Sequence, residues 1–254
     1  MHRLITILTL VFLPFCAFAE LSEEEQKKIA IESCNQSYLA KEPIAFDICM
    51  PLAKENVADS QLAIANMLYW GWGNKAVRNY KKAVFWYKKS AVNGNREASY
   101  HLGVLYEKGL GVDTDYGKSF RWFLSSAKKG YAPSQFNVAN MYAKGAGIRA
   151  SEYGATKWYH RAAQQGEVSS QYNLANRLAI GKGVVQNIAE AYKWYMIAEN
   201  YGDTDAAKSR LLLEKELTEP EKIKAMKEAL AFKPITEDGS EENGISNQVF
   251  PRDK

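Results

Sequence analysis

Histidine and cysteine are the residue types in this sequence best suited to metal binding, proton transfer or redox chemistry. His101 and His160 stand in unlike sequence surroundings and far apart along the chain, so we expect them not to share a metal ion. No Ser/His/Asp or Cys/His order and no paired carboxylates stand out as a catalytic set. The sequence therefore predicts no catalytic residues, no metal site and no cofactor, with both histidines at ordinary surface or groove positions.

The cysteines point to a structural bond. Cys16 lies in a segment that we expect to be removed, which leaves Cys34 and Cys49. An even count in an oxidising compartment favours a disulfide, and closing a loop of about 15 residues would stabilise the fold by about 3 kcal/mol. We predict that this bond joins the N-terminal helix to the first repeat; the alternative is two buried thiols.

Residues 1–19 have the composition of a cleaved export leader. A short basic start with Arg3 precedes an apolar run from Leu4 to Phe15, and Ala17-Phe18-Ala19 supplies a small-x-small cleavage pattern. The run is short for a membrane span, although an uncleaved anchor is the alternative. A lipoprotein anchored at Cys16 is disfavoured by the bulky residue before it. We therefore expect a periplasmic or secreted protein.

The charge of the mature chain is mild. Without Arg3, 32 basic and 29 acidic residues remain, a net charge of +3. This value gives no support to nucleic-acid binding. No second apolar stretch could span a membrane, so we expect no stable membrane insertion, and we expect a monomer.

The chain repeats itself at an interval of 36 residues. The recurring positions are Trp86, Trp122, Trp158 and Trp194, together with Gly94, Gly130, Gly166 and Gly202. Glycine pairs keep the same interval at 109/111, 145/147 and 181/183, and an earlier pair at 71/73 fits a two-residue insertion. A phosphate-binding loop would need a strand before such glycines, whereas helical sequence precedes these, so they indicate turns. We expect the tryptophans to form core and not a carbohydrate platform.

Each repeat predicts two helices. The second helix should begin after a capping residue, which is Asn79, Asp115, Ser151 or Asn187 in the four copies. Apolar residues then recur at helical spacing until a glycine ends the helix. A single pair of this kind cannot bury its apolar face, so the copies must stack. The predicted fold is an all-α solenoid of antiparallel helix pairs.

The ends of the array depart from the repeat, as helical caps do. Our predicted boundaries are a capping helix at 20–42, the solenoid at 43–213, a second capping helix at 214–233 and a disordered polar tail at 234–254. Capping boxes open the two terminal helices, Ser22 with Glu25 and Thr218 with Glu221. In the first copy Ile48 replaces the tryptophan and Asn56 the glycine.

The motifs A-x-x-W-Y, A-A-x-x-G, Q-Y-N-L and Y-x-x-G-x-G-V resemble the Sel-one-like repeat family, a relative of the tetratricopeptide repeats. The resemblance is clearest in "ATKWYHRAAQQGEVSSQYNLANRLAIGKGV". It implies a right-handed superhelix whose concave face binds proteins or peptides. Exported bacterial members resemble adaptors or regulators in envelope or host-contact processes. A cysteine-rich branch linked to β-lactam binding and hydrolysis is a poor match, because no cysteine follows Leu52.

A polar stripe on the first helices is the predicted binding surface. In helix-pair solenoids the first helices line the concave side, so we expect these side chains to form a ladder along a groove. The candidate residues are Asn66, His101, Val104, Lys108, Asn137, Asn140, Lys144, Asn173 and Asn176. Amides both donate and accept hydrogen bonds, which suits a peptide backbone or a sugar. The alternative is that the asparagines bond only to neighbouring backbone.

Three function classes follow. The favoured one is a non-enzymatic adaptor that binds a protein or peptide partner through its concave face. The second is a glycan or peptidoglycan binder, and the least favoured is a β-lactam-binding hydrolase. We expect Asn140 and Asn176 to contribute to binding and little to stability.

Overall fold

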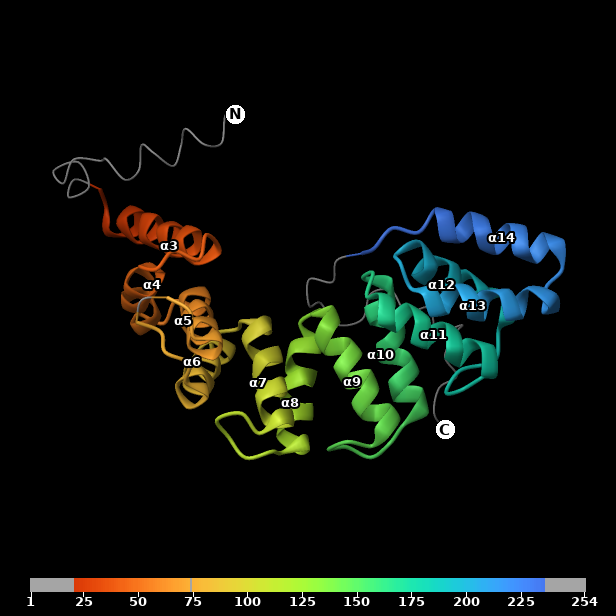
Figure 1. The fold of residues 1–254 in the computed structure, drawn as a ribbon, viewed down its shortest axis with the longest axis horizontal. Coiled ribbons are helices and arrows are strands. Elements are labelled where there is room, and N and C mark those ends of the chain that lie inside the picture. The colour runs from red at the N-terminus through yellow and green to blue at the C-terminus, as the bar shows by residue number, and fades with distance from the viewer. Residues whose placement is uncertain (1–20, 74, 236–254) are drawn as a thin grey trace. The chain divides into compact units, whose positions relative to one another are not determined.

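The computed structural model describes residues 21–73 and 75–235 of the chain. It divides into two compact units, residues up to Asn95 (unit 1) and residues from Arg96 (unit 2). Within the described ranges every regular element is a helix, and consecutive helices pack side by side within each unit (Figure 1). The all-α fold of stacked helix pairs predicted from the repeats is confirmed.

The described part of unit 1 contains four helices: α3 (Glu23–Leu39), α4 (Ala45–Lys54), α5 (Ala58–Trp70) and α6 (Tyr80–Val92). Helix α3 begins with the predicted capping box, in which Ser22 and Glu25 exchange side-chain and backbone bonds. A disulfide joins Cys34 of α3 to Cys49 of α4. Both cysteines are fully buried, so the bond ties the terminal helix to its neighbour inside the core of unit 1.

Unit 2, as far as it is described, contains three helix pairs followed by a group of C-terminal helices. The pairs are α7 (Arg96–Lys108) with α8 (Tyr116–Lys128), α9 (Ala132–Lys144) with α10 (Glu152–Gln164), and α11 (Val168–Ile180) with α12 (Ile188–Asn200). The group that follows is α13 (Thr204–Leu213), a short 3₁₀ turn η1 (Glu214–Glu216) and α14 (Glu219–Leu230). Helix α14 opens with the predicted Thr218/Glu221 capping box and packs along α12 (Figure 1).

The four predicted caps begin the second helices α6, α8, α10 and α12. Each side chain accepts a hydrogen bond from the backbone N–H three residues later, at distances from 2.8 to 3.0 Å. In the first copy Asn56 takes the place of the helix-ending glycine and adopts a positive φ of 64°. Asparagine is among the few residues that tolerate this conformation, so the departure in sequence preserves the turn.

In two turns of unit 2, the second glycine allows a close approach between successive repeats. Gly147 has a φ of 72°, and a Cβ atom there would overlap the carbonyl oxygen of Tyr116 at the start of α8. Gly183 meets Glu152 at the start of α10 in the same way. Glycine is therefore required twice over, for the backbone conformation and for the close approach to the preceding repeat.

The core of unit 2 runs through all its helix pairs. The apolar face of each first helix packs between second helices, through residues such as Val138 and Leu174, which are fully buried. Trp158 and Trp194 belong to this core as expected, with exposed fractions of 9% and 4%. Trp86 and Trp122, at the equivalent positions of α6 and α8, are only half-buried.

The C-terminal boundary differs from the sequence prediction. Pro234 and Ile235, assigned to a disordered tail, pack on α10: the backbone N–H of Ile235 donates to the carbonyl oxygen of Gln164 at 3.0 Å. Phe232 stacks edge-on against Trp194, with ring centroids 5.6 Å apart. The apolar side chains just after α14 thus fasten this segment to the last full repeat; residues 236–254 lie outside the described part.

The close approach at Gly147 predicts a specific cost. Gly147→Ala should lower the free energy of unfolding by more than Gly202→Ala, with a difference of about 1–3 kcal/mol. Both positions have positive φ, 72° and 97°, but a Cβ atom at Gly202 meets nothing within 4 Å. Urea denaturation of the two variants measures the difference. Equal losses in the free energy of unfolding would show that the close contact with Tyr116 does not contribute to the cost.

Candidate binding surface

The predicted polar stripe lies on the accessible side of the first helices in unit 2. On α9 and α11 about half of the other positions are buried, whereas the stripe residues are all half-buried or exposed. Lys108 and Lys144, each the last residue of its helix, are exposed. We call this stripe the first-helix surface; its residues in unit 2 are His101, Val104, Lys108, Asn137, Asn140, Lys144, Asn173 and Asn176.

Asn137 and Asn173 are each held by their own helix. The Nδ2 of Asn137 donates to the carbonyl oxygen of Pro133 at 3.0 Å, and that of Asn173 donates to Ser169 at 2.7 Å. Within the described residues, the side-chain carbonyl oxygens of both accept no hydrogen bond. The contact with the backbone fixes the orientation of each amide and leaves its side-chain carbonyl oxygen able to accept a hydrogen bond from a ligand.

Asn140 and Asn176 hold tyrosines of the following helix. The hydroxyl of Tyr159 donates to Oδ1 of Asn140 at 2.5 Å, and the hydroxyl of Tyr195 donates to Oδ1 of Asn176 at 2.7 Å. Burial raises the pKa of both tyrosines, so each hydroxyl keeps the proton that it donates. These hydrogen bonds join the two helices of each pair, so they argue against the expectation that Asn140 and Asn176 contribute little to stability.

In the neighbouring repeat of α7 and α8, both the donor and the acceptor of this hydrogen bond are replaced by apolar residues. Val104 occupies the slot of Asn140, and Phe123 occupies the slot of Tyr159. Phe123 is fully buried, and Val104 packs against the core. A buried hydroxyl without an acceptor is costly, so hydroxyl and amide are present together or absent together. Val104 is thus part of the packing and gives the stripe no polar group.

Asn66 is the equivalent residue in unit 1, and it is buried. Its Nδ2 donates to the hydroxyl of Tyr38 at 2.7 Å, and its Oδ1 accepts from the hydroxyl of Tyr87 at 2.6 Å. Its exposed fraction is 5%. Tyr38 of helix α3 accepts a hydrogen bond from the amide N–H of Asn66. Among the described residues, the corresponding N–H groups of Asn140 and Asn176 in unit 2 have no such acceptor. Asn66 therefore has a structural role.

His101 pairs with an acid on its own helix. Its Nε2 lies 3.6 Å from Oε1 of Glu97, and the hydrogen bond with His101 lowers the pKa of that carboxyl. His160, expected at the surface, is half-buried beside Trp194, whose packing partner Phe232 comes from the C-terminal segment. Burial lowers the pKa of His160 to about 4, so this ring is neutral at pH 7.

An aromatic row beside the asparagines was missed by the sequence reasoning. Tyr100, Phe136 and Tyr172 precede the residues of the stripe by one position and are half-buried. Each ring lies against the aromatic ring of its partner helix, with centroids 5.7, 6.1 and 5.8 Å apart. Their common 36-residue interval, an aromatic residue directly before His101, Asn137 and Asn173, was the available clue. The first-helix surface thus combines amide groups with partly exposed aromatic rings.

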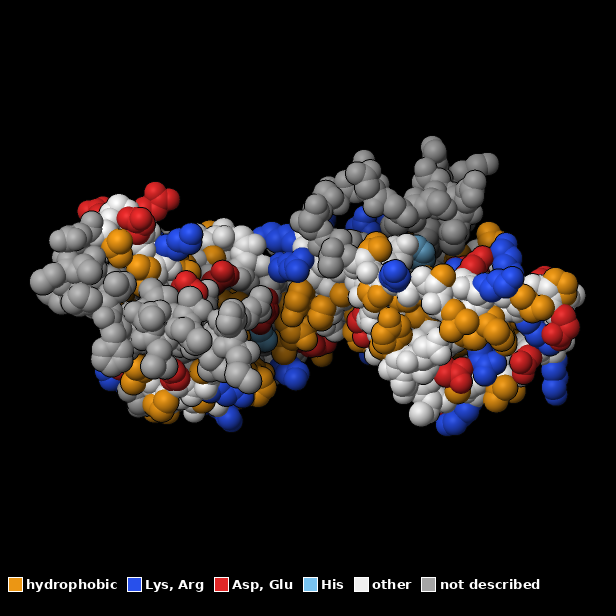
Figure 2. All heavy atoms as spheres, turned by 90° about the horizontal axis from the view of Figure 1, so that it is seen from above, with side chains coloured by type: hydrophobic (Ala, Val, Ile, Leu, Met, Phe, Trp, Pro, Cys, Tyr) orange, Lys and Arg blue, Asp and Glu red, His pale blue; other side chains and the backbone are white. Residues whose placement is uncertain are grey.

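The described residues contain neither a metal-ligand cluster nor a membrane-spanning helix. Among them, no three His, Cys, Asp or Glu side chains are placed to hold a metal ion. No helix in the described ranges is both long enough and apolar enough to cross a membrane. On the face drawn in Figure 2, acidic and basic side chains are interspersed with apolar ones.

Comparison with known proteins identifies the repeats. A family model described as Sel1 repeat matches residues 58–95, 96–131, 132–167 and 168–198. These ranges begin later and end earlier than the array expected at 43–213. Among curated proteins, the sequence search finds no significant match.

Two solved structures are similar over most of the chain. One is a protective antigen present in uropathogenic Escherichia coli strains and displaying an SLR fold, with 26% identity and a TM-score of 0.67 over 82% of this chain. The chain spans only 48% of that protein. The other is a Sel1 repeat protein from Oxalobacter formigenes, with 24% identity and a TM-score of 0.66; the match covers 80% of this chain and 85% of that one. The second similarity concerns the fold alone.

The tyrosine–asparagine pair can be tested against the repeat that lacks it. Asn140→Val alone should lower the free energy of unfolding by about 1–3 kcal/mol, because it leaves the Tyr159 hydroxyl buried without its acceptor. Adding Tyr159→Phe, which reproduces the Val104 and Phe123 pair, should recover much of that loss. Chemical denaturation of the single and double variants measures the coupling, and strictly additive losses would contradict it.

Proposed function

The chain belongs to the Sel1 repeat family, whose repeats generally mediate protein interactions, and we propose that it is an exported, non-enzymatic adaptor. In this proposal another polypeptide binds in extended form along the first-helix surface of unit 2. The partner would then be organised by the repeat scaffold without being chemically altered.

The orientation of the amides is the observation that carries this proposal. Asn140 and Asn176 use their oxygens internally, and within the described residues their N–H groups form no hydrogen bond. Asn137 uses an N–H internally and offers its oxygen. The repeats of α9 and α11 therefore each offer a donor and an acceptor three residues apart on one helix. A peptide backbone carries the complementary pair, a C=O and an N–H, in every residue.

The aromatic row supplies the second component of such a site. Tyr100, Phe136 and Tyr172 lie next to the amides and are held by rings of the second helices. Aromatic side chains that are already fixed lose little conformational freedom on binding and provide large apolar contacts. Amides would then bind the backbone of the partner, and the rings would contact its side chains.

Export has two lines of support. The sequence of residues 1–19 has the features of a cleaved leader, and the buried Cys34–Cys49 disulfide suits an oxidising compartment. We therefore propose a periplasmic or secreted location.

A glycan is the second candidate ligand. Amides beside partly exposed aromatic rings also suit the hydroxyls and the apolar faces of a sugar. The two candidates differ in what the mature protein retains: a discrete polypeptide from an envelope extract, or isolated cell wall.

The amide donors can be removed without disturbing the helix pairs. Asn140→Asp with Asn176→Asp keeps an oxygen for each tyrosine hydroxyl but replaces both N–H donors with negative charge. We expect this variant to retain its melting temperature within a few degrees and to lose polypeptide capture about tenfold or more, as loss of a central contact does. Quantitative pull-down from envelope extract measures the loss.

A charge-matched variant controls for the two added negative charges. Arg121→Ala with Lys157→Ala removes two positive charges on second helices of the same unit and should leave capture unaltered. The proposal would be contradicted if the aspartate variant captured the polypeptide as well as the unaltered protein does. Retention of the protein on cell wall with no polypeptide bound would also contradict it.

A further inference from the structure

We infer that unit 1 carries a second binding surface, formed around α6, for an acidic peptide with large apolar side chains. We call it the Phe85 surface; its residues are Phe46, Val77, Lys82, Phe85, Trp86, Lys89 and Val92. It lies on a second helix and is separate from the first-helix surface, so it goes beyond the function proposed above.

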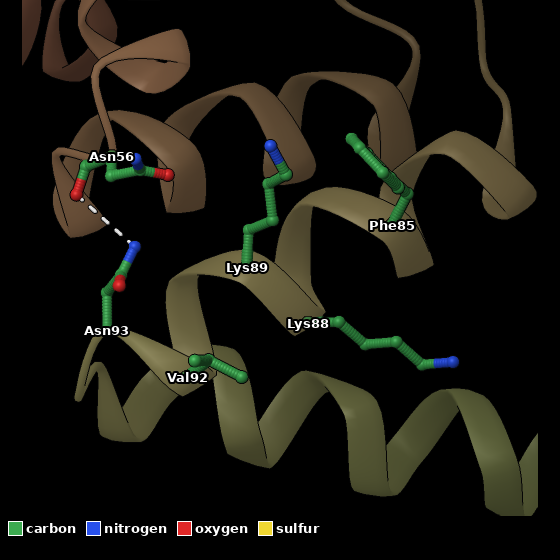
Figure 3. Close-up of a pocket in the computed structure, with 6 residues that line it drawn as sticks. All are labelled: Asn56, Phe85, Lys88, Lys89, Val92 and Asn93. Atoms are coloured by element: carbon green, nitrogen blue, oxygen red, sulfur yellow. Dashed lines mark hydrogen bonds between the residues drawn. The ribbon is translucent and has the colours of Figure 1, made fainter.

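Two hollows flank the ring of Phe85. The smaller, of about 290 Å³, is drawn in Figure 3 and is lined by Asn56, Phe85, Lys88, Lys89, Val92 and Asn93. The side chain of Asn93 donates to the backbone oxygen of Asn56 at 3.2 Å, shown as the dashed line. This hydrogen bond connects the end of α6 to the turn after α4 and bounds the smaller hollow at that side.

The larger hollow, of about 570 Å³, lies between α4, α6 and the segment that connects α5 to α6. Phe46 and Met50 line it from α4, and Phe85 and Trp86 line it from α6. Lys82 also contributes to its lining. Both hollows thus combine an apolar lining with lysine side chains, an arrangement that accepts an apolar side chain and places a charge beside it.

The apolar residues of this surface are peculiar to α6. Phe85 and Val92 lie two helical turns apart on one side of the helix, with exposed fractions of 52% and 80%. The corresponding residues of the other second helices are charged or carry amides: Arg121 and Lys128, Lys157 and Gln164, and Lys193 and Asn200. The repeat fold therefore does not require apolar side chains here, and their exposure in α6 calls for another explanation.

Charge identifies the kind of partner. Helix α6 contains four lysines and no acidic residue. Lys89 lies over the rings of Phe85 and Trp86, with Nζ at 5.1 and 5.4 Å from their centroids, so its charge is held beside the apolar contact. The nearby Asp47 is already paired with Lys75 at 2.8 Å. Carboxylates on a partner would lie near the positive charges of Lys82 and Lys89.

The shape of the surface favours a peptide over a membrane. Binding to a lipid surface relies on apolar side chains that project from a helix into the bilayer. Around Phe85 the apolar groups instead line hollows on both sides, and Trp86 is half-buried. Hollows receive side chains, so the occupant is a peptide in which phenylalanine or leucine is flanked by glutamate or aspartate.

The test uses the full mature chain and a fluorescein-labelled peptide of glutamates around two phenylalanines. Fluorescence anisotropy should show binding that weakens as salt is added, because exposed charges are screened. Phe85→Gln should weaken binding about tenfold, and Lys82→Glu with Lys89→Glu should weaken it at least as much. Since these side chains are largely exposed or at the rim of a hollow, circular dichroism should show unaltered folding.

Matched controls separate this surface from the rest of the chain. Arg121→Ala with Lys157→Ala, at the slots equivalent to Phe85, should bind the peptide normally, as should the Asn140→Asp, Asn176→Asp variant. A peptide with lysines in place of the glutamates should not bind. Failure of the acidic peptide to bind would overturn the inference. So would binding by the Phe85 variant and the lysine variant that is as tight as binding by the unaltered protein. Binding to phosphatidylglycerol vesicles that requires Phe85, without binding of the peptide, would overturn it in favour of a membrane.

Discussion

The close approach of successive repeats is the constraint on which the structure of unit 2 depends. A single helix pair cannot cover its apolar face, so stability requires each pair to pack on the next. Gly147 and Gly183 permit this packing, because their turns lie against the backbone at the start of α8 and α10. Any side chain at these glycines would push the repeats apart and expose the core between them. The glycines recur at an interval of 36 residues because successive repeats make the same contact.

The same packing decides which polar groups remain for binding. Where a second helix carries a tyrosine, its buried hydroxyl takes the oxygen of an asparagine on the first helix, as Tyr159 does with Asn140. Where it carries Phe123, the first helix has Val104 instead. In the proposed function, one side chain would combine structure and recognition: the oxygen stabilises the helix pair, and the N–H groups would bind the ligand. Fixing a donor before binding lowers the entropy that binding must overcome.

The sequence predicted the elements better than the contacts. Helix pairs, caps and turns follow from local patterns, and Asn79 and its equivalents cap second helices as expected. The role of Asn140 depends on a tyrosine 19 residues away, which no local pattern reveals. Arg177 occupies a slot that holds Leu105 and Met141 in other repeats, yet it is buried and donates to Glu152 at 2.8 Å. Such contacts between helices become visible only in three dimensions.

The central claim is that the first helices of unit 2 bind a polypeptide, and site-specific photo-cross-linking in intact cells tests it most directly. A benzophenone side chain would replace Asn173 on the first-helix surface or, as the control, Lys157 on a second helix of the same unit. We expect one discrete cross-linked polypeptide from position 173 and none from position 157. Equal cross-linking from both positions, or none from position 173, would contradict the account.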